Sequence, residues 1–178
     1  MGDPPGDGPV AFEAYGLFFR QWRLEDTEVM VALFDTDQMN RWTPLASPFT
    51  RETAVAYVEA AWDARAAGTT QLAVTLTRGG PPVGEVIVFP AAEPDEVELA
   101  YAVGAHHQGK AVGRRAVLGA LELAQSQGAQ RAVLKIAERN AASAAVARAA
   151  GFVETDAPLL ERQRKGFVLR LRTWTRDL

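Results

Sequence analysis

The chain has no cysteine among its 178 residues and only two histidines, which are adjacent at His106 and His107. The absence of cysteine excludes disulfides, thiolate metal ligands and an acyl-enzyme formed on a thiol. Two neighbouring histidines are too few for a histidine-rich metal site, and a surface loop explains them better. We therefore expect no bound metal and no covalent intermediate on a thiol.

The sequence also lacks a long apolar run and an excess of positive charge. No 18 consecutive apolar residues occur and no charged-then-apolar leader opens the chain, so we expect no membrane span and a cytoplasmic location. The 22 acidic residues outnumber the 19 basic ones, and the formal net charge is −3. A chain of this charge has no overall attraction for nucleic acid or an anionic membrane, so any polyanion must be held locally.

Length and composition indicate one folded domain. A chain of 178 residues with 48% hydrophobic content can bury one substantial core, and a second domain would not fit. Residues 1–10, MGDPPGDGPV, have little to bury and predict a disordered tail before a single domain over residues 11–178.

Strand-like and helix-like periodicities alternate along the chain. We expect strands at residues 17–21, 71–77, 83–89, 96–103, 131–137 and 167–174. Helices are expected within residues 22–35, from Thr50 to Gly68, from Gly113 to Gly128 and from Asn140 to Gly151. Residues 40–49 and 159–166 are predicted as loops. This order predicts an α/β fold whose sheet is of mixed direction.

The central unit is a strand that ends at Val103, a loop of sequence QGKAVG at residues 108–113, and a helix. Small residues that let a ligand approach the backbone occupy three places of the loop, namely Gly109, Ala111 and Gly113. Positive charge is supplied by Lys110, Arg114 and Arg115. Because a helix N-terminus offers unpaired N–H groups to an anion, the loop is a candidate pyrophosphate site, with plain turn chemistry as the alternative.

Three segments carry a family resemblance: LAYAV at 99–103, HHQGKAVGRRAV at 106–117 and NAASAAVARAAGF at 140–152. Their order and spacing resemble the acetyl-CoA-binding core of the GCN5-related N-acetyltransferases (GNAT). The loop signature of that family is Arg or Gln, two residues, Gly, one residue, then Gly or Ala. Gln108, Ala111 and Gly113 stand at its three fixed places. Because Ala111 replaces the usual Gly, either its backbone is in an ordinary conformation or the pyrophosphate is bound less closely.

The resemblance extends from about Leu17 to Trp174 and is greatest to the RimJ/RimL branch, which acetylates the N-termini of ribosomal proteins. It implies a mixed central sheet flanked by helices, with acetyl-CoA in a gap where the strand ending at Val103 splays from the strand beginning near Arg131. Val103 would offer its N–H to the thioester carbonyl. The implied cofactor-binding residues are Tyr101, Ala102, Val103, Gln108, Gly109, Lys110, Ala111, Val112, Gly113, Arg114, Asn140 and Ser143.

Ser143 is the candidate proton donor to the leaving thiolate. By composition alone, Asn140 would be a local helix cap and Ser143 a solvated residue. The resemblance implies instead that both lie beside the pantetheine arm, with the hydroxyl near the sulfur. Many relatives outside the RimJ/RimL branch donate the proton from a tyrosine seven residues after the asparagine, and Ala147 stands at that place.

Glu98 lies within an otherwise apolar strand. It either faces solvent or an arginine, or, as the resemblance implies, it acts as a base through water. Glu85 is the alternative carboxylate on the substrate side, and Trp42 in a proline-flanked loop is implied to border the acceptor site.

Without a thiol nucleophile, we expect direct transfer to an amine. At pH 7 an α-amine of pKa near ~8 costs about 1.4 kcal/mol to deprotonate, whereas a lysine amine near ~10.4 costs about 4.6 kcal/mol. The preferred acceptor is therefore a peptide N-terminus. A small amine such as an aminoglycoside or polyamine, and a non-catalytic acyl-CoA-binding module, are the alternatives, and a homodimer is left open.

Overall fold

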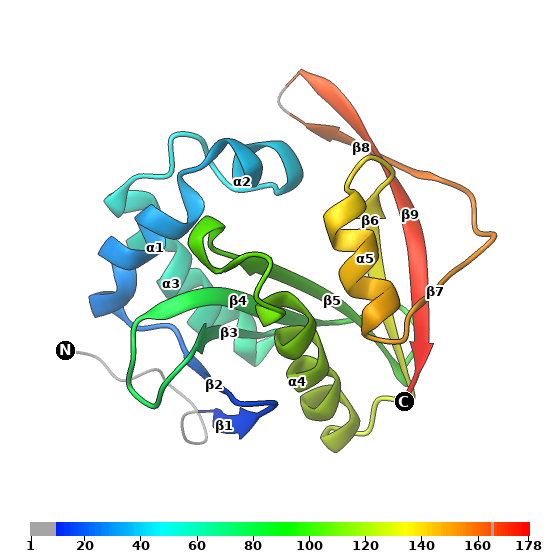
Figure 1. Cartoon of the computed structure of the whole chain (residues 1–178), viewed down its shortest axis with the longest axis horizontal. Coiled ribbons are helices and arrows are strands. Elements are labelled where there is room, and N and C mark those ends of the chain that lie inside the picture. Colours follow the sequence, from blue (N-terminus) through cyan, green and yellow to red (C-terminus); the bar gives the residue numbers. More distant parts are fainter. Residues whose placement is uncertain (1–9, 165) are drawn as a thin grey trace.

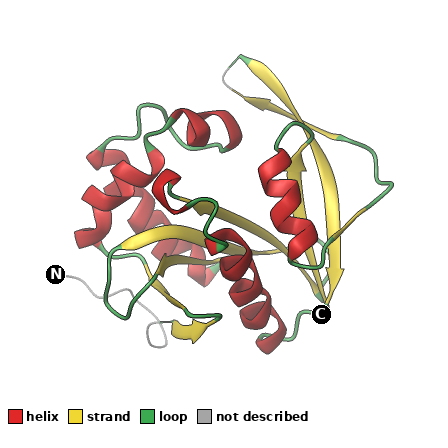
Figure 2. Cartoon of the chain, in the orientation of Figure 1, coloured by secondary structure: helices red, strands yellow, loops and turns green. Residues whose placement is uncertain are grey.

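A computed structural model of the chain describes residues 10–164 and 166–178 (Figure 1). The predicted tail therefore lies, except for Val10, outside the described residues. Within them the chain forms one sheet with helices packed on both of its faces, as Figure 2 shows. No helix in this part of the chain is both long and apolar enough to cross a membrane.

Nine strands form the sheet of the described residues, in the order β1-β2-β3-β4-β5-β6-β9-β7, and β8 pairs with β9. Their bounds are β1 Ala11–Ala14, β2 Leu17–Gln21, β3 Thr70–Thr75, β4 Pro82–Pro90, β5 Glu96–Val103, β6 Arg131–Ala137, β7 Val153–Glu154, β8 Leu160–Arg164 and β9 Phe167–Asp177. Neighbours are antiparallel except β5 and β6, which run parallel. The predicted α/β fold with a mixed sheet is confirmed.

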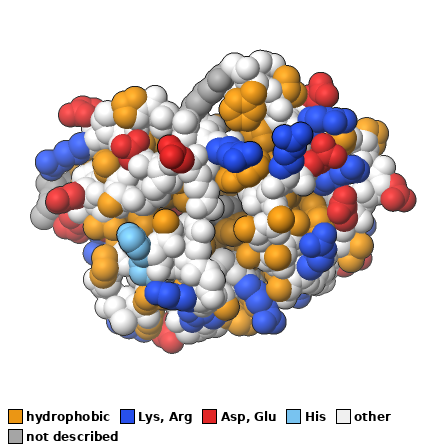
Figure 3. Space-filling model, turned by 45° about the horizontal axis from the view of Figure 1, so that its top comes forward, with side chains coloured by type: hydrophobic (Ala, Val, Ile, Leu, Met, Phe, Trp, Pro, Cys, Tyr) orange, Lys and Arg blue, Asp and Glu red, His pale blue; other side chains and the backbone are white. Residues whose placement is uncertain are grey.

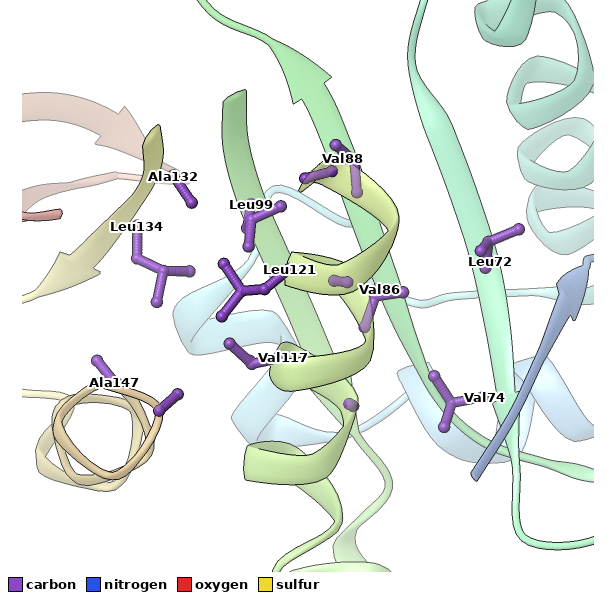
Figure 4. Close-up of a cluster of buried hydrophobic side chains, with 14 of the residues drawn as sticks. Leu72, Val74, Val86, Val88, Leu99, Val117, Leu121, Ala132, Leu134 and Ala147 are labelled. Carbon is purple, nitrogen blue, oxygen red and sulfur yellow. The ribbon is translucent and has the colours of Figure 1, made fainter. Parts of the chain in front are cut away.

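The helices are α1 Thr27–Phe34, α2 Asp37–Trp42, α3 Arg51–Ala66, α4 Val112–Ser126 and α5 Ala141–Ala149, with short 3₁₀ turns at Leu24–Asp26 and Ala105–His107. The larger core cluster lies between the sheet and α4 and α5. Figure 4 shows Val117 and Leu121 of α4 pointing toward Leu99 of β5 and Leu134 of β6. A second cluster packs α1, α2 and α3 on the opposite face.

The sheet splits between its two parallel strands. Only the first halves pair, Glu96–Leu99 with Arg131–Leu134, while β5 continues beside β4 as far as Val103. The last four residues of β5 therefore have an open edge on the β6 side. This confirms the predicted gap between the strand that ends at Val103 and the strand that begins at Arg131.

Two segments predicted as loops, 40–49 and 159–166, are regular structure in part, since α2 extends into the first and β8 lies within the second. Asp37–Trp42 is a short helix, whose first turn is capped by Thr36 accepting a hydrogen bond from the Met39 N–H at 3.2 Å. Met39 is buried, so packing against the second cluster stabilises a helix too short to show a periodic pattern. The charged segment 159–166 contains β8, which forms a hairpin with β9. Apart from Leu160, the residues of β8 are polar or charged, so the strand lacks the alternation of apolar and polar residues by which a strand is predicted from sequence.

Candidate active site

A cavity of about 480 Å³ lies where β5 and β6 separate. Its wall comes from three parts of the chain: α2, the end of β5 with the following loop and the start of α4, and α5. The lining residues are Gln38, Met39, Trp42, Thr43, Tyr101, Ala102, Val103, Gln108, Gly109, Ala111, Val112, Gly113, Arg114, Asn140, Ala142, Ser143, Ala145, Val146 and Ala149. The structure thus brings together every cofactor residue predicted from the sequence except Lys110, which is exposed on the loop.

The loop delivers unpaired N–H groups to this cavity. The first backbone hydrogen bond of α4 joins the Arg115 N–H to the Ala111 carbonyl, so the N–H groups of Val112, Gly113 and Arg114 have no acceptor within the helix. All three residues line the cavity, and Arg114 adds a positive charge. This N-terminus suits a pyrophosphate.

Ala111 adopts a left-handed conformation, with φ of 59°, directly before α4. Of the two alternatives that the sequence left for Ala111, an ordinary backbone conformation is therefore wrong. The turn into the helix requires the left-handed region, which costs an L-residue other than glycine on the order of 1–2 kcal/mol. The signature's usual glycine would avoid this strain.

Gln108 connects the loop to two other elements. Its side-chain Nε2 donates to Gln38 Oε1 at 2.7 Å and to the Val103 carbonyl at 3.2 Å. Gln38 lies on α2, the helix that the sequence did not predict, so nothing in the sequence pattern identified it as part of this site. The contact holds the loop against α2 and the end of β5.

Two hydroxyls meet at the side of the cavity formed by α5. Tyr101 Oη and Ser143 Oγ lie 3.0 Å apart, and the Ser143 N–H donates to Asn140 Oδ1 at 3.1 Å. Burial raises the pKa of Tyr101, and the Ser143 hydrogen bond lowers it by less, so the phenol stays protonated. The predicted cap by Asn140 is confirmed, but Ser143 is engaged with Tyr101 rather than simply solvated.

Ala147, at the place of the tyrosine found in other GNAT branches, is fully buried in the larger core cluster. The residues of α5 that line the cavity are mostly small, namely Ala142, Ser143, Ala145 and Ala149, beside Val146. Tyr101 is therefore the tyrosine that the structure places in this cavity, and it comes from β5 rather than from α5.

Neither predicted carboxylate lines the cavity. Glu98 pairs with Phe89 and Val133 in the middle of the sheet, five residues before Val103. Because side chains alternate along a strand, Glu98 lies on the opposite face of β5 from Tyr101. Its separation from the end of the strand is on the order of 16 Å. The structure does not bring Glu98 to the hydroxyl pair.

Glu85 is a buried carboxylate beneath the cavity, with 4% of its surface exposed. It accepts hydrogen bonds from Trp22 Nε1 at 2.7 Å, Tyr57 Oη at 2.8 Å and Gln71 Nε2 at 2.9 Å. Burial raises its pKa to about 7, although the three donors lower it in part. Its sheet partner Ala102 lines the cavity, but Glu85 itself does not.

Trp42 lines the cavity at the end of α2, where Arg41 stacks over its ring at 4.7 Å from the centroid. His106 and His107 lie in the short turn after β5 and are not among the lining residues. In residues 10–164 and 166–178, no three potential metal-ligating side chains lie close enough to hold an ion.

Solved structures with the same architecture cover nearly the whole chain. The ribosomal-protein-S5-alanine acetyltransferase of Vibrio fischeri aligns with a TM-score of 0.76 and 20% identity, over 94% of this chain and 96% of that one. Mycobacterium smegmatis RimJ in complex with CoA-disulfide aligns with a TM-score of 0.79 and 16% identity, over 95% of this chain and 86% of that one. Salmonella typhimurium yncA with its cofactor acetyl-CoA aligns with a TM-score of 0.70 and 18% identity, over 92% of this chain and 94% of that one. At these identities the likeness establishes the fold.

Family membership rests on the sequence. No curated protein matches the chain closely enough to count as a relative. The family model for the acetyltransferase (GNAT) domain matches residues 16–153, which contain β5, the loop, α4, β6 and α5. The cavity with its anion-binding loop, the split sheet and this match agree, and the chain therefore belongs to the GNAT family as an N-acetyltransferase with acetyl-CoA as its acyl donor.

Proposed function

We propose that this enzyme acetylates the N-terminal α-amine of a peptide or protein. The observation that carries the proposal is the chemistry of the cavity wall. Its described lining residues include the Tyr101–Ser143 hydroxyl pair but no aspartate, glutamate or histidine. Such a wall can protonate a leaving group but has no carboxylate base of its own for the attacking amine. It therefore favours an acceptor whose amine is already partly neutral at pH 7.

The difference between amine classes is large enough to decide the preference. An α-amine of pKa near ~8 is about one-tenth neutral at pH 7, whereas a lysine amine near ~10.4 is neutral in fewer than about one molecule in a thousand. Without a base in the cavity, a lysine acceptor carries about 3 kcal/mol more of this cost. A peptide N-terminus can therefore react without a base that removes its proton.

The open edge of β5 positions the acyl donor. Hydrogen-bonding directions alternate along a strand, and the Gly104 N–H donates to the Val83 carbonyl on the β4 side. The Val103 N–H therefore faces the open side. We assign it to the thioester oxygen, where it stabilises negative charge during attack, with the pyrophosphate at the N-terminus of α4.

Acetyl-CoA supplies the acetyl thioester. The amine nitrogen forms a bond to the acetyl carbon, the carbon–sulfur bond breaks, and the extra proton of the amine passes to water. We assign Ser143 Oγ as the proton donor to the departing sulfur and Tyr101 Oη as the group that returns a proton to Ser143. Water, which takes up the proton of the amine, then returns a proton to Tyr101. A thiol of pKa near ~8.5 is already a fair leaving group, so this assistance is modest.

The likeness to RimJ and to an S5-alanine acetyltransferase supports a ribosomal-protein N-terminus as the acceptor, in the cytoplasm. A small amine is the second candidate: an aminoglycoside, because its amines can have a lowered pKa, and after it a polyamine. Family membership argues against the non-catalytic acyl-CoA module.

The deciding experiment supplies acetyl-CoA with a panel of acceptors and measures both free CoA thiol and product mass. The panel holds peptides with free N-termini, the same peptides with blocked N-termini and an internal lysine, an aminoglycoside and spermidine. We expect acetylation of the free N-termini and little of the blocked peptides. Acetylation confined to small amines, or to lysine, would refute the proposal. Binding of acetyl-CoA without turnover of any acceptor would favour the non-catalytic acyl-CoA-binding module instead.

A further inference from the structure

A second cavity adjoins the cofactor cavity. It measures about 480 Å³ and lies between the end of α2, the turn after β6 and the first residues of β9. Trp42 lines both cavities, and Arg139 of the second directly precedes Asn140 of the first. Figure 1 shows α2 and the β8–β9 hairpin on the same side of the molecule. A molecule whose amine lies in the first cavity can therefore extend into the second.

The second cavity is positively charged in a chain whose net charge is −3. Its ionic lining residues are Arg41, Glu138, Arg139 and Arg170. Glu138 is already neutralised, since it accepts a hydrogen bond from Arg172 at 3.0 Å and lies 3.6 Å from Arg170. Within the described residues no carboxylate lies within 4.0 Å of Arg41 or Arg139. Two arginines thus lack a counter-charge.

The same cavity has an apolar side. Phe167 is 41% exposed and Val168 is 48% exposed, and both line the cavity together with Trp42. Figure 3 shows basic and hydrophobic side chains side by side on this face of the molecule. Apolar surface next to unpaired arginines fits a peptide, whose backbone and side-chain stems cover the apolar part while its carboxylates meet the guanidinium groups.

We propose that the second cavity binds the part of the acceptor that follows its N-terminal residue and selects acidic side chains there. This rests on the proposed function, because it assumes a peptide acceptor. Arg41 and Arg139 supply the selection, and Trp42 and Phe167 supply sequence-tolerant contact. Arg170 contributes less, because it already lies within ion-pair distance of Glu138 and Glu161.

The experiment compares two peptides of equal length and equal first residue. One carries glutamate at the three following positions, and the other carries glutamine. We expect kcat/KM to be on the order of tenfold higher for the acidic peptide, mainly through KM, because exposed charge pairs contribute modestly to ground-state binding. The preference should shrink at high salt.

Substitutions of single arginines test which residues produce the preference for the acidic peptide. Arg139→Gln and Arg41→Gln should each reduce the acidic-to-amide ratio by about threefold. Arg131→Gln is the matched control, since it also removes one positive charge but lies at the other end of β6, roughly 20 Å from Ala137. It should keep the ratio of the wild-type enzyme.

The outcomes separate the two proposals. Equal kcat/KM for both peptides, with normal acetylation, would overturn the acidic selection and leave the proposed function intact. Acetylation of neither peptide would refute the proposed function and the selection with it. Inhibition by an RNA oligonucleotide, relieved by Arg139→Gln and accompanied by equal peptide rates, would assign the cavity to nucleic acid and overturn the inference.

Discussion

At the scale of single residues, we propose that Tyr101 and Ser143 together do the work that other GNAT branches give to one tyrosine. The two residues are 42 positions apart and meet at 3.0 Å. Ala147, where those branches carry the tyrosine, is buried away from the cavity. Under this proposal the proton donor is assembled from a strand, β5, and a helix, α5, rather than from α5 alone.

Removing the hydroxyls should lower turnover in a graded way. We expect Ser143→Ala to lower kcat on the order of tenfold at every pH, because it acts on the leaving group. Tyr101→Phe should lower kcat by about threefold with an unchanged KM for acetyl-CoA, because the ring and the backbone are kept. Steady-state kinetics between pH 6 and pH 9 measure both. A wild-type kcat in Ser143→Ala would contradict the assignment.

Glu98→Gln tests whether Glu98 acts as a base. The position of Glu98 outside the cavity favours wild-type rates across this pH range. Slow turnover at pH 7 that recovers toward pH 9 would instead support the role as a base through water that the family resemblance implies.

Glu85 should make stability depend on pH. Its pKa is raised from 4.5 to about 7 in the folded protein, so the folded state holds the proton more tightly than the unfolded state. The stabilisation is complete below pH 4.5 and is lost as the pH rises through 7. The difference between the pKa values of the unfolded and folded states corresponds to about 3 kcal/mol of unfolding free energy.

Glu85→Gln should abolish that dependence, because an amide cannot ionise but can accept from Trp22 and Gln71 and donate to Tyr57. Urea unfolding at pH 5 and pH 8 measures the effect, with Glu59→Gln on the exposed face of α3 as the control. Parallel pH dependence in the wild-type protein and Glu85→Gln would show that Glu85 is not the group responsible.

At the scale of elements, the N-terminus of α4 is the proposed anion site. A Cβ built at Gly113 would meet Tyr101 Cε2 at 3.4 Å and Val146 Cγ2 at 3.5 Å, which are ordinary contacts. Alanine therefore fits at this position. A glutamate would extend a carboxylate into the cavity, where the unpaired N–H groups favour the phosphates of the donor.

We expect Gly113→Glu to weaken acetyl-CoA binding by at least about tenfold, because a carboxylate repels the pyrophosphate and occupies its space. Calorimetry measures the affinity, and circular dichroism checks that the fold is retained. Gly113→Ala is the matched control and should bind acetyl-CoA within a few-fold of the wild-type protein. Equal affinity in Gly113→Glu would remove the loop from the binding site.

At the scale of the whole molecule, the split between β5 and β6 creates the site. The helices α1 to α3 pack on one face of the sheet, and α4 and α5 pack on the other. The cavity passes between these groups because the two strands pair only over Glu96–Leu99. Charge is also distributed unevenly at this scale. Although the net charge of the chain is −3, Arg41 and Arg139 beside the cofactor cavity have no carboxylate within 4.0 Å among the described residues.

The sequence by itself determined the elements whose signals are local. The strands at 96–103 and 131–137 have the predicted bounds, and Thr50 and Asn140 cap helices as predicted. Side-chain alternation and capping involve residues within four positions of one another, so they can be read along the chain. The loop at 108–113 and its helix follow from the same kind of signal.

Only the tertiary structure decided which distant side chains meet. The Tyr101–Ser143 contact, the three donors of Glu85 and the distance of Glu98 from the cavity depend on strand register and on how far β5 and β6 diverge. The same holds for α2, which is stabilised by packing of Met39 rather than by its own periodicity. Contacts between residues far apart in sequence leave no local pattern, because they form only when the separate elements pack together.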